Sequence, residues 1–243
     1  MLGSKPLLTD QELAALRHFS TPTIANAIEV FGVRPRNVGF TDASIRCLLP
    51  VAEPIVGYTV TACIRASAPP EQPVRRADYW RWLLTVPRPR IVVIEDLDDP
   101  PAVGSFWGEV NVTIHRALGC IGTITNGGVR DLAEVERLGF GYFASAAIVS
   151  HAYVHLTSYG EPVRVGGLAV QPGDLLHADQ HGAVLIPPEV APRLADMAAR
   201  FEATEREFLA RVQAADLTVE RLAEDYAAFD RARAALKGGL APQ

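Results

Sequence analysis

Apolar residues recur at helical spacing near both ends of the chain, and short apolar runs fill its centre. Near the start, Thr9 followed three residues later by Glu12 has the spacing of a capping box, which predicts a helix over residues 9–18. Thr21-Pro22 predicts the start of a second helix that ends near Gly32, because proline is well suited to the first helical position. The pattern therefore predicts two short helices before the first strand.

The central part of the chain alternates between strand and helix patterns. β-Branched and small residues alternate over residues 58–64, and a compact apolar run covers residues 90–95, so both are predicted to be strands. Helices are predicted over residues 75–85 and 105–118, followed by a strand over 120–125 and a turn at Asn126-Gly127-Gly128. This alternation is typical of an α/β domain.

Beyond residue 142 the pattern becomes mostly β and then helical. Short strands separated by glycine and proline turns are predicted over residues 143–149, 162–170, 174–177 and 183–186. After Pro187-Pro188, apolar residues at helical spacing predict two C-terminal helices, the second over residues 217–236. We expect an α/β domain over residues 1–187 and a helical extension over residues 188–243, which packs on the same domain or on a neighbouring subunit.

Composition narrows the class of protein. With 243 residues, 49% of them apolar, the chain can bury a substantial core. A formal charge of −5 without any basic run argues against nucleic-acid binding, which needs clustered lysine and arginine. The first six residues lack a basic segment followed by an apolar core, and no apolar run approaches the roughly 18 residues that span a bilayer. We expect a cytoplasmic protein that does not bind membranes.

The main chemical signal is a set of charged residues around the predicted strand 120–125. Gly108-Glu109 is followed, after twenty residues, by Arg130-Asp131 and then by Glu134. The hard oxygens of three carboxylates suit a hard divalent cation, and a guanidinium suits an anionic substrate. An alternative is that the acidic residues stabilise the first turn of a helix by facing its dipole. The spacing alone leaves both interpretations open.

Other metal-type residues are less informative. His151 and His155 are four residues apart, as are His177 and His181, a spacing that brings two imidazoles together on a helix. Both pairs lie in stretches predicted as strand or turn, and no HExxH pattern accompanies them, so a shared metal site is disfavoured. Each histidine remains a candidate acid or base near neutral pH. The three cysteines lack the CxxC spacing of a zinc site.

The charged set, together with the turn Asn126-Gly127-Gly128 before Arg130, resembles a motif of the RraA-like family, which includes class II 4-hydroxy-4-methyl-2-oxoglutarate aldolases. The resemblance covers most of residues 20–187, and further segments follow one another in the family's order: Ser20-Thr21-Pro22-Thr23, Gly57-Tyr58-Thr59-Val60, Gly166-Gly167-Leu168-Ala169-Val170, Pro172-Gly173-Asp174 and Gly182-Ala183-Val184-Leu185-Ile186-Pro187. The chain is identified as a member of this family on these segments.

Membership implies a fold and an assembly. The fold is a layered α-β-β-α sandwich of the phosphohistidine-swivelling type with C-terminal helices, and the assembly is a ring-shaped homotrimer or a homohexamer of two such rings with sites between subunits. Membership does not determine the activity, because the family contains metal-dependent aldolases, oxaloacetate decarboxylases and a regulator that binds ribonuclease E.

The resemblance implies a role for each member of the charged set. Asp131 would be the direct ligand of a Mg²⁺ or Mn²⁺ ion, Glu109 would act through bound waters, and Glu134 would hold the geometry around the ligands. Arg130 would face the pyruvyl oxygen of the substrate. The implied catalytic residues are therefore Arg130, Asp131 and Glu109.

The implied substrate site also uses backbone groups. Gly108 would border this site, and the backbone amides of Val110 and Asn111, which follow it, would bind the carboxylate of a 2-oxo acid beside Arg130. Cleaving a carbon–carbon bond beside a 2-oxo acid leaves a pyruvate enolate, whose charge a metal and Arg130 stabilise more than they stabilise the ketone. We expect a lyase that cleaves a 4-hydroxy-2-oxo acid to pyruvate, decarboxylates oxaloacetate, or both.

Two other functions remain open. One is a non-catalytic binding ring like the ribonuclease E regulator, although such a ring has no need for the carboxylate set. The other is an enolate-forming enzyme that acts on a different oxo acid, with residues 151–159 and 177–181 as its specificity region.

The chain departs from the family pattern at several positions. Glu109 and Asn26 stand where relatives have aspartate, and His181 occupies a position that is usually acidic. The family's Phe-Ala-Arg-Gly pattern is reduced to Phe143-Ala144-Ser145-Ala146, which removes an arginine and favours a smaller 2-oxo acid over 4-carboxy-4-hydroxy-2-oxoadipate. Glu205 is the candidate for the C-terminal acid that enters an adjacent subunit's site in the aldolases.

Overall fold

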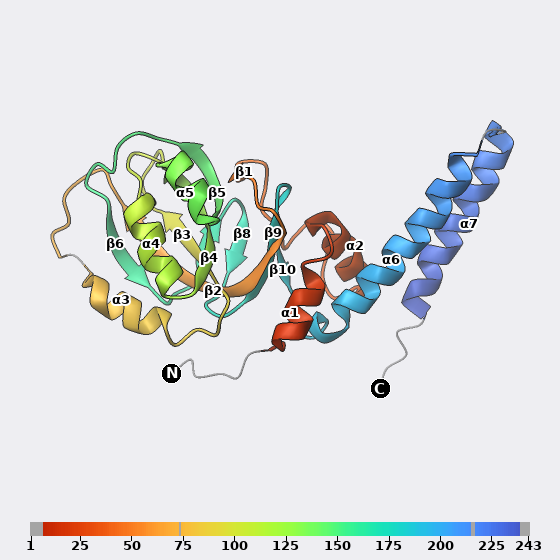
Figure 1. The fold of residues 1–243 in the computed structure, drawn as a ribbon, viewed down its shortest axis with the longest axis horizontal. Coiled ribbons are helices and arrows are strands. Elements are labelled where there is room, and N and C mark those ends of the chain that lie inside the picture. Colours follow the sequence, from red (N-terminus) through yellow and green to blue (C-terminus); the bar gives the residue numbers. More distant parts are fainter. Residues whose placement is uncertain (1–6, 73, 215–216, 239–243) are drawn as a thin grey trace.

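The protein is built around an eight-stranded sheet, seen in a computed structural model that describes residues 7–72, 74–214 and 217–238 (Figure 1). Its centre consists of the parallel strands β2 (Ile55–Arg65), β3 (Arg90–Asp96), β4 (Cys120–Val129) and β5 (Gly141–Ala147). Four antiparallel strands flank them: β1 (Arg46–Leu49) on β5, β6 (His155–Tyr159) and β9 (Leu175–Asp179) on β2, and β10 (Gly182–Ile186) on β9.

Different layers cover the two faces of the central strands. Because side chains alternate along a strand, Val92 and Ile94 of β3 share one buried cluster while Ile91 and Val93 share another. The first cluster lies under the helices α3 (Arg76–Leu83), α4 (Glu109–Ala117) and α5 (Leu132–Leu138). The second lies under a two-stranded sheet formed by β7 (Val163–Val165) and β8 (Leu168–Val170). The predicted layered α/β fold is confirmed.

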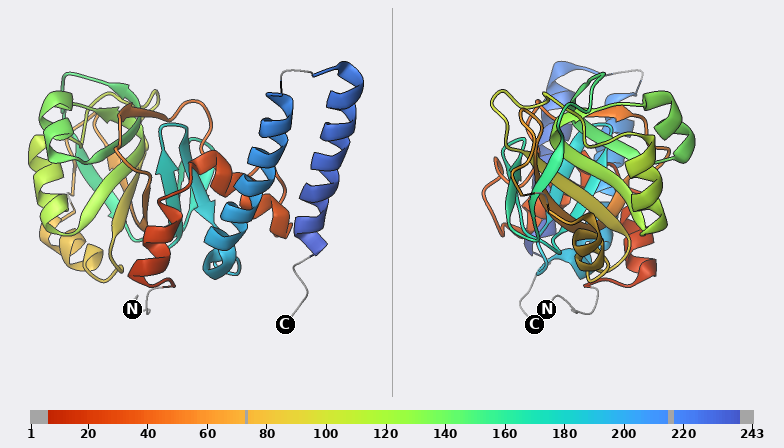
Figure 2. Two further views of the ribbon diagram at one scale, coloured as in Figure 1. Left: turned by 45° about the vertical axis from the view of Figure 1, so that its right-hand side comes forward. Right: turned by 90° about the vertical axis from the view of Figure 1, so that its left-hand side faces the viewer.

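The remaining helices gather at the β9–β10 end of the sheet (Figures 1 and 2). These are α1 (Asp10–Leu16), α2 (Thr21–Phe31), α6 (Ala191–Val212) and α7 (Val219–Gly238). The predicted capping box of Thr9 and Glu12 is present, and Ser20 caps α2. Helix α6 packs on α2, and α7 returns along α6 away from the sheet. None of the helices in the described part of the chain combines the length and apolar character needed to cross a bilayer.

Several predicted boundaries are wrong, and tertiary pairing explains two of them. The predicted turn Asn126-Gly127-Gly128 lies inside β4, because Gly128 and Val129 pair with β5 beyond an irregularity at Thr125. Helix α4 begins at Glu109 instead of residue 105, because Trp107 bridges to Val129 and holds the preceding segment beside β4.

Other strands were missed or merged. The strand predicted over residues 162–170 is the β7–β8 hairpin, with Gly166 and Gly167 at positive φ in its turn. Strands β1 and β6 were not predicted. Most of their residues are only partly buried, and neither contains a long apolar run that would mark a strand in the sequence. Residues 1 and 243, which bound the predicted domain ranges, and residues 1–6, on which the expectation about a leader rests, lie outside the described residues.

Candidate active site

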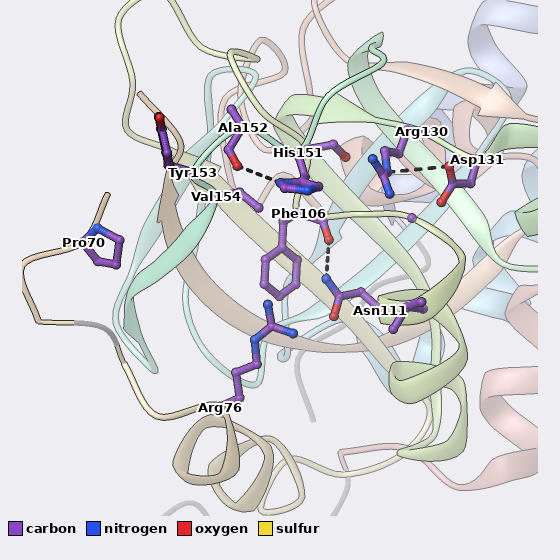
Figure 3. Close-up of a pocket in the computed structure, with 13 residues that line it drawn as sticks. Pro70, Arg76, Phe106, Asn111, Arg130, Asp131, His151, Ala152, Tyr153 and Val154 are labelled. Carbon is purple, nitrogen blue, oxygen red and sulfur yellow. Dashed lines mark hydrogen bonds and ion pairs between the residues drawn. The ribbon is translucent and has the colours of Figure 1, made fainter. Parts of the chain in front are cut away.

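A cavity of about 420 Å³ opens where β4 ends and α4 begins (Figure 3). The walls come from four segments distant in sequence: the start of α3, the turn into α4, the residues after β4 and the loop between β5 and β6. Its lining includes five of the predicted site residues, namely Gly108, Val110, Asn111, Arg130 and Asp131. The structure therefore brings Arg130 and Asp131 into one cavity with the start of α4.

Gly108 provides space for neighbouring side chains and is not needed for backbone freedom. Its φ of −158° is extended backbone that any residue adopts. A Cβ at this position, however, would lie 2.5 Å from Asp131 Oδ2 and 3.2 Å from Arg130 Nε. The glycine thus allows a carboxylate and a guanidinium to approach the first turn of α4, which explains the pairing of Gly108 with Arg130-Asp131 in the sequence.

Asp131 has an unusual backbone and a shared carboxylate. Its φ of 58° and ψ of 44° place it in the left-handed region, which aspartate tolerates better than most non-glycine residues. Asp131 stands at the N-cap position of α5, yet its Oδ2 accepts a hydrogen bond from Glu109 N at 2.9 Å. Its carboxylate therefore caps α4, and within the described residues it makes no capping bond to its own helix. Asp131 therefore caps the neighbouring helix α4 and not the helix that it begins.

Arg130 is fixed at its backbone and half-exposed at its side chain. Arg130 N donates to Trp107 O at 3.1 Å, and the Tyr142 hydroxyl donates to Arg130 O at 3.4 Å. Its Nε lies 3.6 Å from Asp131 Oδ1, and the two side chains are 35% and 33% exposed. Burial, followed by the nearby Asp131 carboxylate, raises the pKa of Tyr142, so this residue holds the site as a neutral phenol. The guanidinium keeps further N–H groups for a ligand in the cavity.

The first turn of α4 adds backbone donors. The N–H groups of Val110 and Asn111 have no intrahelical acceptors, because an α-helix leaves its first four donors unpaired. The side-chain amide of Asn111 donates to Phe106 O, which holds the turn in place. Together with the positive end of the helix dipole, these groups favour an anion at the cavity wall.

The other two predicted carboxylates stand apart. The described side chains of Glu109 and Glu134 lie outside the set that lines the cavity, and Glu134 is 3.9 Å from Arg137 on the outer face of α5. Among the residues that the structure describes, no group of three or more histidine, cysteine, aspartate or glutamate side chains is arranged to hold a metal ion. Asp131 alone does suit Mg²⁺ or Mn²⁺, since such ions keep several waters and bind through one or two carboxylates together with the substrate. The proposed ligand roles stay predictions.

Two cavity residues were not assigned to the site from the sequence. Arg76, at the first position of α3, points towards Phe106, and His151 enters from the loop between β5 and β6 (Figure 3). The sequence marked His151 as a candidate acid or base and as part of the specificity region 151–159, but did not link it to the charged set. No sequence pattern links Arg76 or His151 to the charged set, because only the tertiary fold brings these segments together.

The other flagged histidines have structural surroundings. His177 is fully buried, its Nε2 donates to Leu16 O at 3.2 Å, and its Nδ1 accepts from the Thr21 hydroxyl at 2.9 Å. Burial lowers the pKa of His177 to about 4, so the ring is neutral. His181 lies outside the cavity, with its Nδ1 3.0 Å from Asp179 Oδ1. Through Thr21, His177 and Asp179 join the start of α2 to β9.

Two further sequence candidates are remote from the cavity. Asn26 on α2 lines a separate hollow of about 250 Å³ beside α6 and α7. Glu205 lies on α6, on the opposite side of the molecule from α4 and α5, and burial raises its pKa (Figure 1). The role foreseen for Glu205 therefore requires a second copy of the chain.

Comparison with known proteins points to one family. Residues 21–185 match the family model described as RraA-like: Aldolase/RraA. The protein DlpA of Legionella pneumophila is 24% identical over 58% of this chain, and the aligned part spans 23% of that protein. An uncharacterized protein of Methanocaldococcus jannaschii is 22% identical over 85% of this chain and 91% of its own length. A putative 4-hydroxy-4-methyl-2-oxoglutarate aldolase of Halalkalibacterium halodurans is 26% identical over 40% of this chain and 46% of its own length.

Solved structures agree with this at the level of the fold. An uncharacterized protein of Pseudomonas syringae superposes with a TM-score of 0.69 at 21% identity, covering 94% of this chain and 95% of that one. Streptomyces coelicolor RraAS2, described as an unusual member of the RNase ES inhibitor RraA protein family, superposes with a TM-score of 0.65 at 21% identity, covering 86% and 100% of the two chains.

Proposed function

The chain belongs to the RraA-like family, and from this premise we propose that it is a divalent-metal-dependent lyase that releases pyruvate from a 4-hydroxy-2-oxo acid and decarboxylates oxaloacetate. The family description covers both aldolases and RraA proteins, so the site has to decide between them. The observation that carries the proposal is the close approach at Gly108, which gathers Arg130, Asp131 and the start of α4 around one cavity.

The substrate's 2-oxo acid end fits this part of the cavity. Its carboxylate binds the N–H groups of Val110 and Asn111, where the first turn of α4 favours an anion. Its 2-oxo oxygen faces Arg130, whose guanidinium is permanently charged and whose backbone N–H is held by Trp107 O. The proposed substrate therefore lies along the wall between these groups.

Asp131 would hold the metal ion, which would supply positive charge to the developing enolate oxygen. Glu109, at the first position of α4, would act through bound waters, and Glu134 would support the arrangement from α5. Because the Asp131 carboxylate is already held by Glu109 N, it meets an ion with its orientation set.

Both proposed reactions place negative charge at the same atom. Cleavage of the bond between C3 and C4, or loss of carbon dioxide from oxaloacetate, leaves the electron pair in a pyruvate enolate. Arg130 stabilises the charged enolate oxygen more than the neutral ketone, and this difference lowers the barrier. One constellation of residues can therefore serve both reactions.

Pyruvate release tests the proposal directly. Oxaloacetate and 4-hydroxy-4-methyl-2-oxoglutarate are supplied separately with Mg²⁺, with Mn²⁺ and with a chelator, to the wild type and to Asp131→Ala. We expect metal-dependent pyruvate that is lost in Asp131→Ala and kept in Glu136→Ala, a control that removes an exposed acid from the same helix. Full turnover in a folded Asp131→Ala variant would sink the proposal.

The competing function is a non-catalytic binding protein like the RNase ES inhibitors with which RraAS2 is classed. Absence of pyruvate from both compounds would favour that alternative or a different oxo acid as substrate. We also propose a homo-oligomer, a trimer or hexamer, as the family resemblance implies, in which Glu205 of α6 serves the cavity of a neighbouring copy. Light scattering of the purified chain measures this directly.

A further inference from the structure

We propose that His151 is the base that removes the proton from the C4 hydroxyl of the 4-hydroxy-2-oxo acid. This inference rests on the proposed function and extends it, since the charged set contains no group assigned to that proton. His151 lines the same cavity as Arg130 and Asp131, on the loop between β5 and β6. It would therefore act on the part of the substrate that extends away from the enolate.

The loop that carries His151 is firmly held. Ser105 N donates to Ser150 O at 2.9 Å, which ties the loop to the segment that precedes α4. The backbone of His151 also packs against Gly104, where a Cβ would lie 2.5 Å from the His151 carbonyl oxygen. Close packing and the backbone bond hold the backbone that carries the exposed His151 side chain at a defined place in the wall.

The hydrogen bonding of the ring determines which nitrogen can act as a base. His151 Nδ1 lies 2.7 Å from the carbonyl oxygen of Ala152. A carbonyl oxygen can only accept, so Nδ1 carries the hydrogen. In the neutral ring, Nε2 then holds the free lone pair. The backbone thus selects the tautomer that a general base requires.

The free side of the ring is on the cavity side of the loop. Figure 3 shows the His151 ring between the Ala152 carbonyl and the Arg130 side chain, above Phe106. The charged groups that share the cavity with it are Arg130, Asp131 and, from α3, Arg76. A substrate whose 2-oxo group meets Arg130 would extend its C4 hydroxyl into the space that His151 borders.

The proton transfer completes the aldol cleavage. His151 Nε2 takes the proton of the C4 hydroxyl, and the electron pair of that O–H bond forms the C=O bond of the product carbonyl. The C3–C4 bond breaks, and its electron pair becomes the enolate of pyruvate. The enolate then takes a proton from water at C3, and the imidazolium returns its proton to solvent. General-base assistance of this kind contributes on the order of a hundredfold or more.

Decarboxylation of oxaloacetate does not need this base. The bond that breaks joins C3 to a carboxylate, which leaves as carbon dioxide without losing a proton. The enolate that forms is the same, so Arg130 and Asp131 serve both reactions. A hydroxyl base therefore has a distinctive signature, because its removal slows one reaction and spares the other.

The experiment compares His151→Asn with the wild type in both reactions. The asparagine amide can replace the Nδ1 hydrogen bond to Ala152 O but cannot act as a base. The matched control is His155→Asn, because His155 Nδ1 likewise bonds a backbone carbonyl, that of Tyr153 at 2.8 Å, and the side chain lies outside the cavity lining. Binding of oxalate, a mimic of the pyruvate enolate, and the thermal midpoint report whether the site and the fold survive.

We expect His151→Asn to lower kcat for 4-hydroxy-4-methyl-2-oxoglutarate cleavage by about a hundredfold while oxaloacetate decarboxylation and oxalate binding stay close to wild type. An equal fall in both reactions, or no fall in either, would overturn the inference while leaving the lyase proposal intact. Wild-type protein that decarboxylates without cleaving the aldol substrate would also overturn it. No pyruvate from either compound in the wild type would defeat the lyase proposal itself.

Discussion

Two polar clusters in this molecule lie in opposite settings. Around Gly108, the side chains of Arg130 and Asp131 are each about a third exposed and face a cavity. At the other end of the fold, His177 is fully buried, and both of its ring nitrogens are bonded within the protein. The first cluster keeps donors and acceptors for a ligand, while the second uses its own to join α2 to β9.

The role of a polar residue depends on whether its hydrogen-bonding groups are already paired within the protein. A buried polar group must be paired within the chain, because leaving it unpaired is unfavourable by about 1–3 kcal/mol. A half-exposed group at a cavity can be paired by water and then by substrate. Substitutions in the Gly108 cluster should therefore impair activity and spare stability, and changes at His177 should do the reverse.

Arg130→Ala should have the largest effect on activity. Loss of one preorganised partner for an oxyanion reduces the rate by about a hundred- to a thousandfold, or roughly 3–4 kcal/mol. Steady-state release of pyruvate measures this, and the thermal midpoint should stay near that of the wild type. Arg116→Ala is the matched control, since Arg116 is an exposed arginine in the last turn of α4, outside the cavity lining. Equal losses of activity in the two variants would show that the cavity arginine has no special role in the reaction.

Lowering the pH should weaken the fold through His177. Its pKa is about 4 in the folded chain against an ordinary 6.5, so the unfolded chain binds the proton more strongly. Its contribution is fully present above pH 6.5 and is lost as the pH falls towards 4, by about 3 kcal/mol. Urea unfolding at pH 7.5 and 5 measures the part that is lost by pH 5, about 2 kcal/mol. His115, with the same direction of shift, adds to it.

A His177→Gln variant separates the contribution of His177 from that of the other groups. The variant should be less stable at pH 7.5, and its stability should fall less steeply on acidification than that of the wild type. If stability fell with pH as steeply in the variant as in the wild type, His177 would not be the source of the pH dependence.

Gly108→Ala should reduce activity by about tenfold or more, with little change in stability, because displacement of a reacting group has large kinetic consequences. The new Cβ would lie 2.5 Å from Asp131 Oδ2, while the extended φ of residue 108 accepts alanine. Gly139→Ala is the opposite case, since its φ is +62° and nothing lies within 4 Å of a Cβ there. It should destabilise by about 1 kcal/mol through backbone strain and leave turnover intact. Turnover and thermal midpoints of both variants provide the test.

Arg76→Gln should have the smallest effect and sharpen the picture of the cavity's charge. An exposed cation such as Arg76 that faces the second carboxylate of a ligand contributes up to about 1 kcal/mol to binding. Binding of 2-oxoglutarate, which has two carboxylates, should therefore weaken about fivefold. Binding of 2-oxopentanoate, which lacks that carboxylate, should hardly change. Calorimetry measures both, and Arg75→Gln is the matched control because Arg75 pairs with Asp78 outside the cavity. Equal weakening of the two ligands would exclude a charge-specific role for Arg76.

Much of the fold followed from local patterns. The capping box of Thr9 and Glu12, the start of α2 at Thr21 and the apolar run of β3 each depend on neighbours within a few residues. The turn predicted at Asn126-Gly127-Gly128 failed because pairing with β5 outweighs the local tendency of glycine and asparagine to form turns. Strand β6 was missed because its pairing with β2 is long-range.

For the site, the sequence by itself determined which residues accompany one another: Gly108 with Arg130 and Asp131, followed by Glu134. It could not determine which of them meet, because contacts across β4 depend on how α4 and α5 pack. Only the tertiary structure turned the Asp131 carboxylate onto α4, left Glu134 outside the cavity lining, and brought Arg76 and His151 into that lining. The physical reason is that local propensity acts along the chain, whereas a cavity forms between segments that packing alone brings together.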